Sequence, residues 1–188
     1  LVKNPRKHPR VSEFKEIIEL IESPSKFEKN INIALRNRAM LEILFSTGMR
    51  ISELLTLKKT QIDKTGRIFI RGKGKKERFV YLTPRAQKHL NNYSGIQKIN
   101  DSLYLFVPYS GKNIHDKDKK ISTNYLQEKI KRYRELLGLN VPISAHGIRH
   151  GFATYLAENG ANPAAIQILL GHESLDTTTR YVHTSDRY

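Results

Sequence analysis

The stretch from residue 67 to residue 82 changes the period of the chain, and this change limits the fold more than any other feature. In RIFIRGKGKKERFVYL, branched and aromatic residues alternate on both sides of a Gly-Lys-Gly centre at residues 72–74. Period-two alternation is typical of a strand, and glycines between two such runs are typical of a tight turn. The sequence therefore predicts an antiparallel β-hairpin in this region.

Most other patterned segments repeat apolar residues at helical spacing. The first predicted helix has its N-cap near Ser12, and the second ends at Gly48, where a left-handed conformation is expected. A short buried strand is predicted over residues 102–111. Helices are predicted over residues 11–23, 31–48, 49–57, 83–93, 122–138, 146–160, 162–172 and 174–183.

The charge balance limits the class of partner. The chain has 188 residues, with 33 Lys and Arg against 18 Asp and Glu, and a formal net charge of +15. This balance is typical of nucleic-acid-binding proteins, although ribosomal, membrane-surface and heparin-binding proteins share it. The chain has no cysteine, which excludes disulfides and thiolate metal sites and favours a reducing cytoplasm. No apolar run approaches the roughly 18 residues that span a bilayer, so we expect a soluble protein.

Several cations have two interpretations. Arg50 begins a predicted helix, where backbone N–H groups favour an anion, but it could equally form a surface pair with Glu53. The hairpin cations, Arg78 among them, would either keep an edge hairpin soluble or place one cation in a DNA groove or an active site. The cations of residues 129–134 would either follow a phosphate backbone or face solvent.

The last third of the chain carries the residue types that a phosphodiester-cleaving site needs. SAHGIRHGFAT holds His146 and Arg149, and LLGHESLDTTTRY holds His172 and Tyr181. A guanidinium matches two phosphate oxygens, a tyrosine hydroxyl can attack phosphorus, and a histidine can move the proton. Together with Arg50 and a hairpin lysine, the set requires no metal. Taken singly, each histidine could be a core residue and the tyrosine an interface residue.

In their order, these motifs resemble the catalytic domain of the tyrosine recombinases, the phage-integrase family, and most closely its Xer-type branch. The resemblance runs from about residue 11 to residue 188 and rests on MRISELL, RGKGKKERFVYL, SAHGIRHGFAT and LLGHESLDTTTRYVH. One departure is Gly147-Ile148, where a leucine commonly precedes the arginine. The positions that match the catalytic residues of the family are Arg50, Lys73, His146, Arg149, His172 and Tyr181.

The resemblance implies a mainly α fold with a small antiparallel β-sheet. It also implies DNA strand exchange through a 3′-phosphotyrosyl intermediate, with no ATP, metal or other cofactor. The implied partners are double-stranded DNA and three further copies of the chain, which form a homo-tetramer on two recombination sites and exchange a C-terminal segment. No membrane is implied, and we expect a cytoplasmic, nucleoid-associated protein. Residues 1–10 are expected to be a basic linker and residues 11–188 the catalytic domain, with the N-terminal core-binding domain and the C-terminal tail of the family outside this chain.

Two other functions use similar residues. A type IB topoisomerase shares the chemistry but relaxes supercoils, and the Xer-like Gly-Lys-Gly and Leu-Gly-His motifs argue against it. A catalytically inert DNA-binding or accessory module is the second alternative. The intact set of six candidate residues argues against that reading.

Overall fold

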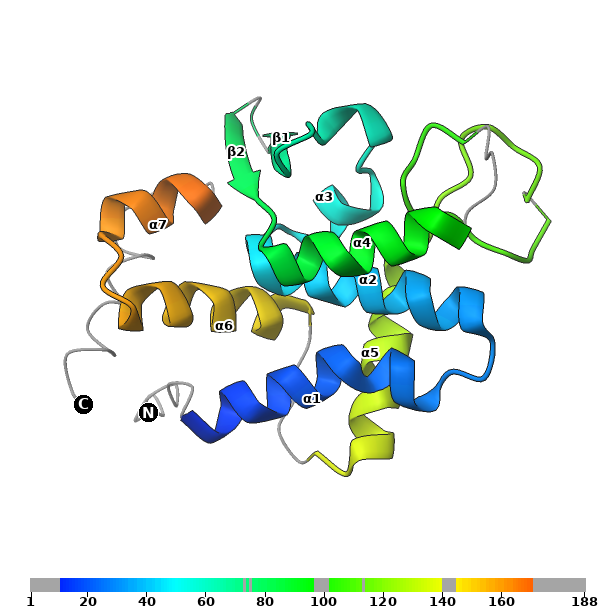
Figure 1. The fold of residues 1–188 in the computed structure, drawn as a ribbon, viewed down its shortest axis with the longest axis horizontal. Helices are drawn as coiled ribbons and strands as arrows, with labels where there is room; N and C mark the ends of the chain where they lie inside the picture. Colours follow the sequence, from blue (N-terminus) through cyan, green and yellow to red (C-terminus); the bar gives the residue numbers. More distant parts are fainter. Residues whose placement is uncertain are drawn as a thin grey trace, which may run out of the picture.

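The computed structural model describes residues 11–72, 74, 76–96, 102–112, 114–139 and 145–170 (Figure 1). The side chains of residues 11–14, 146 and 167–170 stand outside this description, as do the predicted basic linker and the helix predicted over 174–183. The elements in chain order are α1 (Val11–Phe27), α2 (Ile31–Thr47), α3 (Ile51–Leu55), the 3₁₀ turn η1 (Lys59–Gln61), β1 (Arg67–Arg71), β2 (Glu77–Tyr81), α4 (Pro84–Ile96), α5 (Thr123–Leu137), α6 (Ala145–Glu158) and α7 (Pro163–Leu170).

Helix α2 lies at the centre of the fold, and buried residues occur on all its sides. It packs against α1, α4 and α6, which run alongside it in Figure 1. A helix that is buried on every side needs a neighbour on every side. Its side chains Met40, Leu41, Ile43 and Leu44 are accordingly buried in the main hydrophobic core.

Both ends of α2 are fixed by local hydrogen bonds. The Asn30 side chain accepts a hydrogen bond from the N–H of Asn32 at 2.9 Å and so caps the first turn. At the other end, Gly48 adopts φ 65°, and its N–H donates to the Leu44 carbonyl at 2.9 Å. This left-handed residue confirms the predicted helix end and turns the chain directly into α3.

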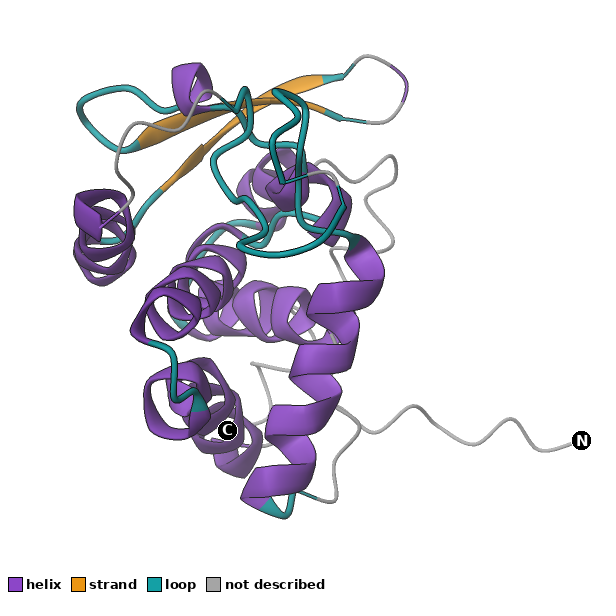
Figure 2. Ribbon diagram, turned by 90° about the vertical axis from the view of Figure 1, so that its right-hand side faces the viewer, coloured by secondary structure: helices purple, strands orange, loops and turns teal. Residues whose placement is uncertain are grey.

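The predicted β-hairpin is confirmed and lies at one end of the helical layers (Figure 2). Its register pairs Arg67 with Tyr81 and Arg71 with Glu77, so residues 72–76 connect the strands. Inward positions carry three aliphatic residues and one cation, while the aromatic rings of the hairpin lie on the other face. The buried inward residues are Ile68, Ile70, Arg78 and Val80.

The strand predicted over residues 102–111 is wrong. The described segment 102–112 has no strand and forms only an isolated bridge between Tyr104 and Lys58. Its central residues Leu105, Phe106 and Val107 are nevertheless buried, and the Leu105 N–H donates to the Leu57 carbonyl at 2.9 Å. The Leu103 N–H also donates to the Lys117 carbonyl at 2.9 Å, so isolated backbone hydrogen bonds replace the ladder of a strand.

A buried arginine completes the attachment of this segment. Arg36 is 2% exposed, and its guanidinium lies between the rings of Tyr109 and Tyr125, 4.8 and 5.1 Å from their centroids. It donates to the Val107 carbonyl at 3.1 Å and to the Tyr125 hydroxyl at 2.6 Å. A hydrogen bond from the Arg36 side chain therefore helps to hold residues 102–112, in place of the expected strand pairing.

Helix α1 is longer than the sequence indicates. It begins at Val11, one residue before the predicted cap Ser12, and continues through Pro24 to Phe27. Pro24 removes one backbone donor, but the N–H of Glu28 still donates to the Pro24 carbonyl at 3.1 Å. The helical path is therefore kept for one more turn.

Helices α6 and α7 confirm two of the helices predicted in the last third, and they form a second, smaller core. Phe152, Ala153, Ala157 and Ile166 make a buried cluster that is separate from the main one.

Among the described residues, no helix is long and apolar enough to cross a membrane.

Candidate active site

Arg50 occupies the junction between α2 and α3. It is the N-cap of α3, with φ −72° and ψ 150°, and its N–H donates to Glu53 Oε1 at 2.7 Å. Glu53 stands at the third position of the helix, where a carboxylate can reach back to the cap. The Arg50 side chain is 38% exposed, and its Nη1 lies 3.8 Å from Glu53 Oε2, beyond hydrogen-bond distance.

Glu53 is held chiefly by an arginine from the hairpin. Arg78 Nη1 donates to Glu53 Oε2 at 2.7 Å, and Arg78 Nη2 donates to Glu53 Oε1 at 2.8 Å. The two side chains are only 4% and 9% exposed. Burial alone would raise the pKa of Glu53, but the hydrogen bonds from Arg78 and from the Arg50 N–H outweigh it and lower that pKa.

The hairpin approaches this ion pair closely at Gly72. A Cβ atom at this position would lie 3.3 Å from Arg78 Nη1 and 3.5 Å from Glu53 Oε2. The Gly72 N–H donates to the Lys76 carbonyl at 2.7 Å, which fixes the end of β1. Lack of a side chain therefore lets the strand end lie against the carboxylate.

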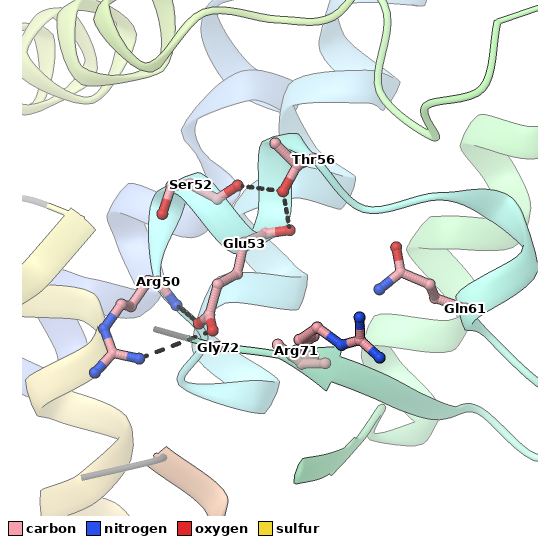
Figure 3. Close-up of a pocket in the computed structure, with 8 residues that line it drawn as sticks. Arg50, Ser52, Glu53, Thr56, Gln61, Arg71 and Gly72 are labelled. Atoms are coloured by element: carbon pink, nitrogen blue, oxygen red, sulfur yellow. Dashed lines mark hydrogen bonds and ion pairs between the residues drawn. The ribbon is translucent and has the colours of Figure 1, made fainter. Parts of the chain in front are cut away.

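A pocket opens between α3 and the hairpin (Figure 3). Its volume is about 480 Å³, and most of the residues that line it are of polar or charged types. Figure 3 shows the Glu53 carboxylate close to Arg50 and Gly72, whereas the Arg71 side chain extends toward Gln61. The lining residues are Arg50, Ser52, Glu53, Thr56, Gln61, Ile70, Arg71 and Gly72.

Arg149 and His146 both lie on α6, one helical turn apart, so the backbone places them on one face. The Arg149 residue is 8% exposed, whereas the side chain of His146 is outside the described part. Helix α6 packs against α2, and so does α3, which follows Arg50. One central helix therefore supports the elements that carry the two predicted phosphate-binding arginines.

Three predicted site residues lie outside the described residues: Lys73, His172 and Tyr181. Lys73 is covalently next to Gly72, whose position against Glu53 is described. Within the described part of the chain, no cluster of three or more His, Asp or Glu residues could hold a metal ion.

The structure places one cation from each of two groups in a contact within the chain. Arg78 does not solubilise the hairpin edge, because it faces inward beside Val80 and binds Glu53. On α5, Lys129 Nζ donates to Glu28 Oε1 at 2.7 Å and is part of an interhelical contact with α1. Sequence reasoning missed Arg78 as a site residue, although its period-two position was a signal.

Comparison with known proteins identifies the family. The Phage integrase family matches residues 10–187. The chain belongs to this family. It is 34% identical over 184 residues to the tyrosine recombinase XerD of Staphylococcus epidermidis, covering 97% of this chain and 61% of that protein. It is 35% identical over 184 residues to the tyrosine recombinase XerC of Thermodesulfovibrio yellowstonii, covering 97% of this chain and 60% of that protein.

Solved structures agree with this assignment. The crystal structure of XerA recombinase matches with a TM-score of 0.77 and 30% identity, over 96% of this chain and 61% of that chain. The XerH site-specific recombinase bound to difH substrate in a pre-cleavage complex matches with a TM-score of 0.75 and 30% identity, over 96% and 51%. The predicted mainly α fold with a small antiparallel sheet is thus confirmed. The chain spans about three fifths of the length of the two sequence relatives.

Proposed function

We propose that this protein is a site-specific DNA recombinase that cleaves and rejoins strands through a 3′-phosphotyrosyl intermediate. The observation that carries the proposal is the position of the Arg50 guanidinium. Its guanidinium lines a cationic pocket at a helix start and lies beyond hydrogen-bond distance of Glu53, whose oxygens accept from Arg78. This arrangement suits a phosphate better than the surface ion pair that the sequence left open.

The proposed reaction assigns one role to each of the six candidates. The Tyr181 hydroxyl attacks phosphorus as His146 accepts its proton, and the bond from phosphorus to the 5′-oxygen breaks. Lys73 gives that oxygen a proton, so a 5′-hydroxyl leaves. Charge on the non-bridging oxygens is stabilised by three donors, which are Arg50, Arg149 and His172.

No energy source beyond the substrate is required by this scheme. The tyrosyl phosphodiester keeps the free energy of the broken bond, and attack by a 5′-hydroxyl returns the tyrosine and reseals a strand. Neither a metal nor ATP therefore enters the proposal. Exchange of strands between two DNA duplexes requires both duplexes to be cut. We therefore propose that four copies of the chain act as a homo-tetramer, in which subunits exchange a C-terminal segment.

Double-stranded DNA is the proposed partner for two reasons. The net charge of +15 supplies the sequence-independent attraction to phosphates. The XerH structures, at 28–30% identity, are complexes of a recombinase with a DNA substrate before and after cleavage. Recombinases among the relatives favour strand exchange over topoisomerase-like relaxation or an inert module. We also propose the cytoplasm, with nucleoid association, as its location.

Covalent capture tests the proposal without knowledge of the target site. The protein would be incubated with end-labelled, sheared genomic DNA of its source organism, and SDS-resistant adducts would be collected by potassium precipitation. We expect adducts on 3′ ends that disappear on protease treatment. The Tyr181→Phe variant should form none while it binds the same fragments nearly as well, because only the nucleophilic hydroxyl is lost.

Tyr188→Phe is the matched control and should keep the adduct. Persistence of the adduct in Tyr181→Phe would move the nucleophile elsewhere, with Tyr188 tested next. DNA binding without any adduct would favour the inert module. Relaxation of supercoiled plasmid without exchange of labelled partners would favour the topoisomerase.

A further inference from the structure

Glu53 creates an electrostatic problem at the proposed phosphate site. Its carboxylate lines the same pocket as Arg50 and lies 3.8 Å from the Arg50 guanidinium. A carboxylate at this position repels a bound phosphate and attracts the very guanidinium that should hold it. Charge pairs near 4 Å interact strongly when they are partly buried, and the Glu53 side chain is only 9% exposed.

Arg78 offsets the negative charge of Glu53 through two hydrogen bonds. It reaches the carboxylate from the buried face of β2 and engages both oxygens, at 2.7 and 2.8 Å. Bidentate pairs of this kind use the in-plane lone pairs of a carboxylate. The Arg50 N–H uses one more acceptor direction at 2.7 Å, so the Arg50 guanidinium is left at the longer distance.

We propose that Arg78 is a positioning residue that neutralises Glu53 and thereby keeps the Arg50 guanidinium available to a phosphodiester. The proposal rests on the proposed function for the identity of that phosphodiester as the scissile group of DNA. Arg78 itself is 4% exposed and acts through Glu53. The competing explanation is mechanical, since the same pair also ties the hairpin to α3.

Charge compensation separates the two explanations. Arg78→Met leaves Glu53 without its main partner, so Arg50 should turn to the carboxylate and lose the phosphate. Adding Glu53→Gln removes the attraction and should release Arg50 again, although the tie between hairpin and α3 remains broken. The mechanical explanation predicts that the double variant is at least as impaired as Arg78→Met.

The measurement is a titration of the Arg50 side-chain Nε–Hε NMR resonance with dimethyl phosphate, a minimal phosphodiester. We expect binding to weaken about tenfold in Arg78→Met, since an uncompensated charge close to the site acts in a partly buried setting. The double variant should return to within about twofold of the parent. Glu53→Gln alone should bind as tightly as the parent or more tightly, because glutamine still accepts from the Arg50 N–H.

Arg67→Met is the matched control. It removes one positive charge from the same hairpin, but its partner Asp63, at 3.0 Å, does not line the pocket. We expect less than about a twofold change for this variant. Arg78→Lys keeps the positive charge but removes the two parallel N–H donors of the guanidinium. If neutralisation of Glu53 is what matters, this variant should retain most of the affinity for dimethyl phosphate.

Specific results would overturn the proposal. These are unchanged binding in Arg78→Met, no recovery in the double variant, weaker binding in Glu53→Gln, or no response of Arg50 in the parent. Because removal of one partner of a buried pair is strongly destabilising, Arg78→Met could fail to fold; Glu53→Gln and the double variant then decide the outcome alone. If the parent binds dimethyl phosphate at Arg50 but forms no covalent adduct with genomic DNA, the proposed function fails while this inference stands.

Discussion

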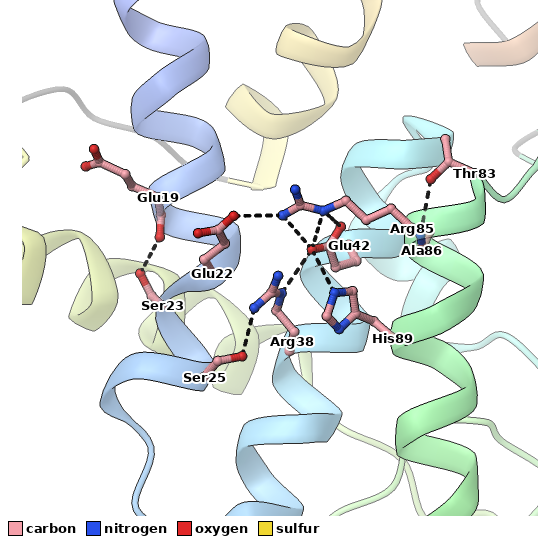
Figure 4. A network of polar contacts seen from close by, with 10 residues as sticks. All are labelled: Glu19, Glu22, Ser23, Ser25, Arg38, Glu42, Thr83, Arg85, Ala86 and His89. Carbon is pink, nitrogen blue, oxygen red and sulfur yellow. Dashed lines mark hydrogen bonds and ion pairs between the residues drawn. The ribbon is translucent and has the colours of Figure 1, made fainter.

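Among the described residues, Glu42 and Glu53 each form ion pairs with two arginines, yet only Glu53 lies at the candidate site. Glu42, on α2, is 3% exposed and accepts from Arg38 at 2.9 Å and from Arg85 at 2.9 and 3.0 Å (Figure 4). Both arginines have further partners, Ser25 and Glu22. Every cation of this cluster is thus bound at hydrogen-bond distance to groups within the chain.

The Glu53 cluster is not closed in this way. Arg78 takes both carboxylate oxygens, and the second arginine, Arg50, stays 3.8 Å away on the wall of a pocket. The Glu42 cluster joins α1, α2 and α4 (Figure 4), whereas the Glu53 cluster leaves the Arg50 side chain 38% exposed. The two clusters therefore differ in one respect: only the Glu53 cluster has an arginine whose guanidinium is beyond hydrogen-bond distance of the carboxylate.

Removing the Arg50 guanidinium should give the largest effect on function. Arg50→Ala should slow covalent adduct formation by about 10² to 10³, the loss typical of one donor to transition-state charge. Its unfolding free energy should change by no more than about 0.5 kcal/mol, because the side chain is 38% exposed and its ion pair is long. Adduct kinetics and urea unfolding would be measured on the same samples.

Arg38→Ala is the control from the closed cluster. It should lower stability and leave the adduct rate per folded molecule unchanged. If Arg38→Ala slowed the reaction as much as Arg50→Ala did, the distinction between the two clusters would be lost.

Breaking the closed cluster should instead cost stability. Glu42→Gln leaves Arg38 with a neutral partner at a site where its side chain is 12% exposed, and we expect a loss of about 3 kcal/mol in unfolding free energy. The loss stays near the lower end for buried pairs because Arg85 is 44% exposed and can be solvated. Urea unfolding measures it, and a loss below about 1 kcal/mol would contradict a structural role for the cluster.

The smallest expected effect concerns pH and His89, whose Nε2 lies 3.6 Å from Glu42 Oε1. Burial first, and then the charge of Arg38, lower the pKa of His89 below its ordinary value of 6.5. The unfolded chain therefore binds this proton more readily, so stability should fall as pH drops from about 6.5 through the lowered pKa. Unfolding of the parent and of His89→Gln would be compared from pH 7.5 to 5, and the parent should lose more stability. An equal loss in both proteins would show that His89 does not titrate differently on folding.

Sequence reasoning succeeded where the determinants are local. Gly48 and Gly138 were predicted to end α2 and α5, and both adopt positive φ angles of 65° and 66°. Ser122 begins α5 by accepting from the Tyr125 N–H, as its place at the start of that helix suggested. Caps and left-handed glycines depend on a few neighbouring residues, so their pattern is visible in the chain.

Prediction from the sequence failed where a residue contacts a partner that is distant in the chain. The apolar run at 102–111 resembles a strand, but the partners of Leu105 and Val107 are Leu57 and Arg36. Lys129 resembles a solvated cation until Glu28 of α1 is placed beside it. The helix start and the resemblance together made Arg50 a phosphate-binding candidate, whereas the reason that its guanidinium stays 3.8 Å from Glu53 required the position of Arg78.

The separate small core of α6 and α7 has a consequence for motion. Ile166 of α7 packs in the small cluster with Phe152, Ala153 and Ala157 of α6, and not in the main core. We therefore expect α7 to open locally without exposing the apolar residues around α2. Amide hydrogens of α7 should accordingly exchange through an opening that requires only part of the global unfolding free energy. The chain that carries His172 and Tyr181 continues directly from α7. An opening of α7 would therefore act on the described segment that directly precedes these two candidates in the sequence.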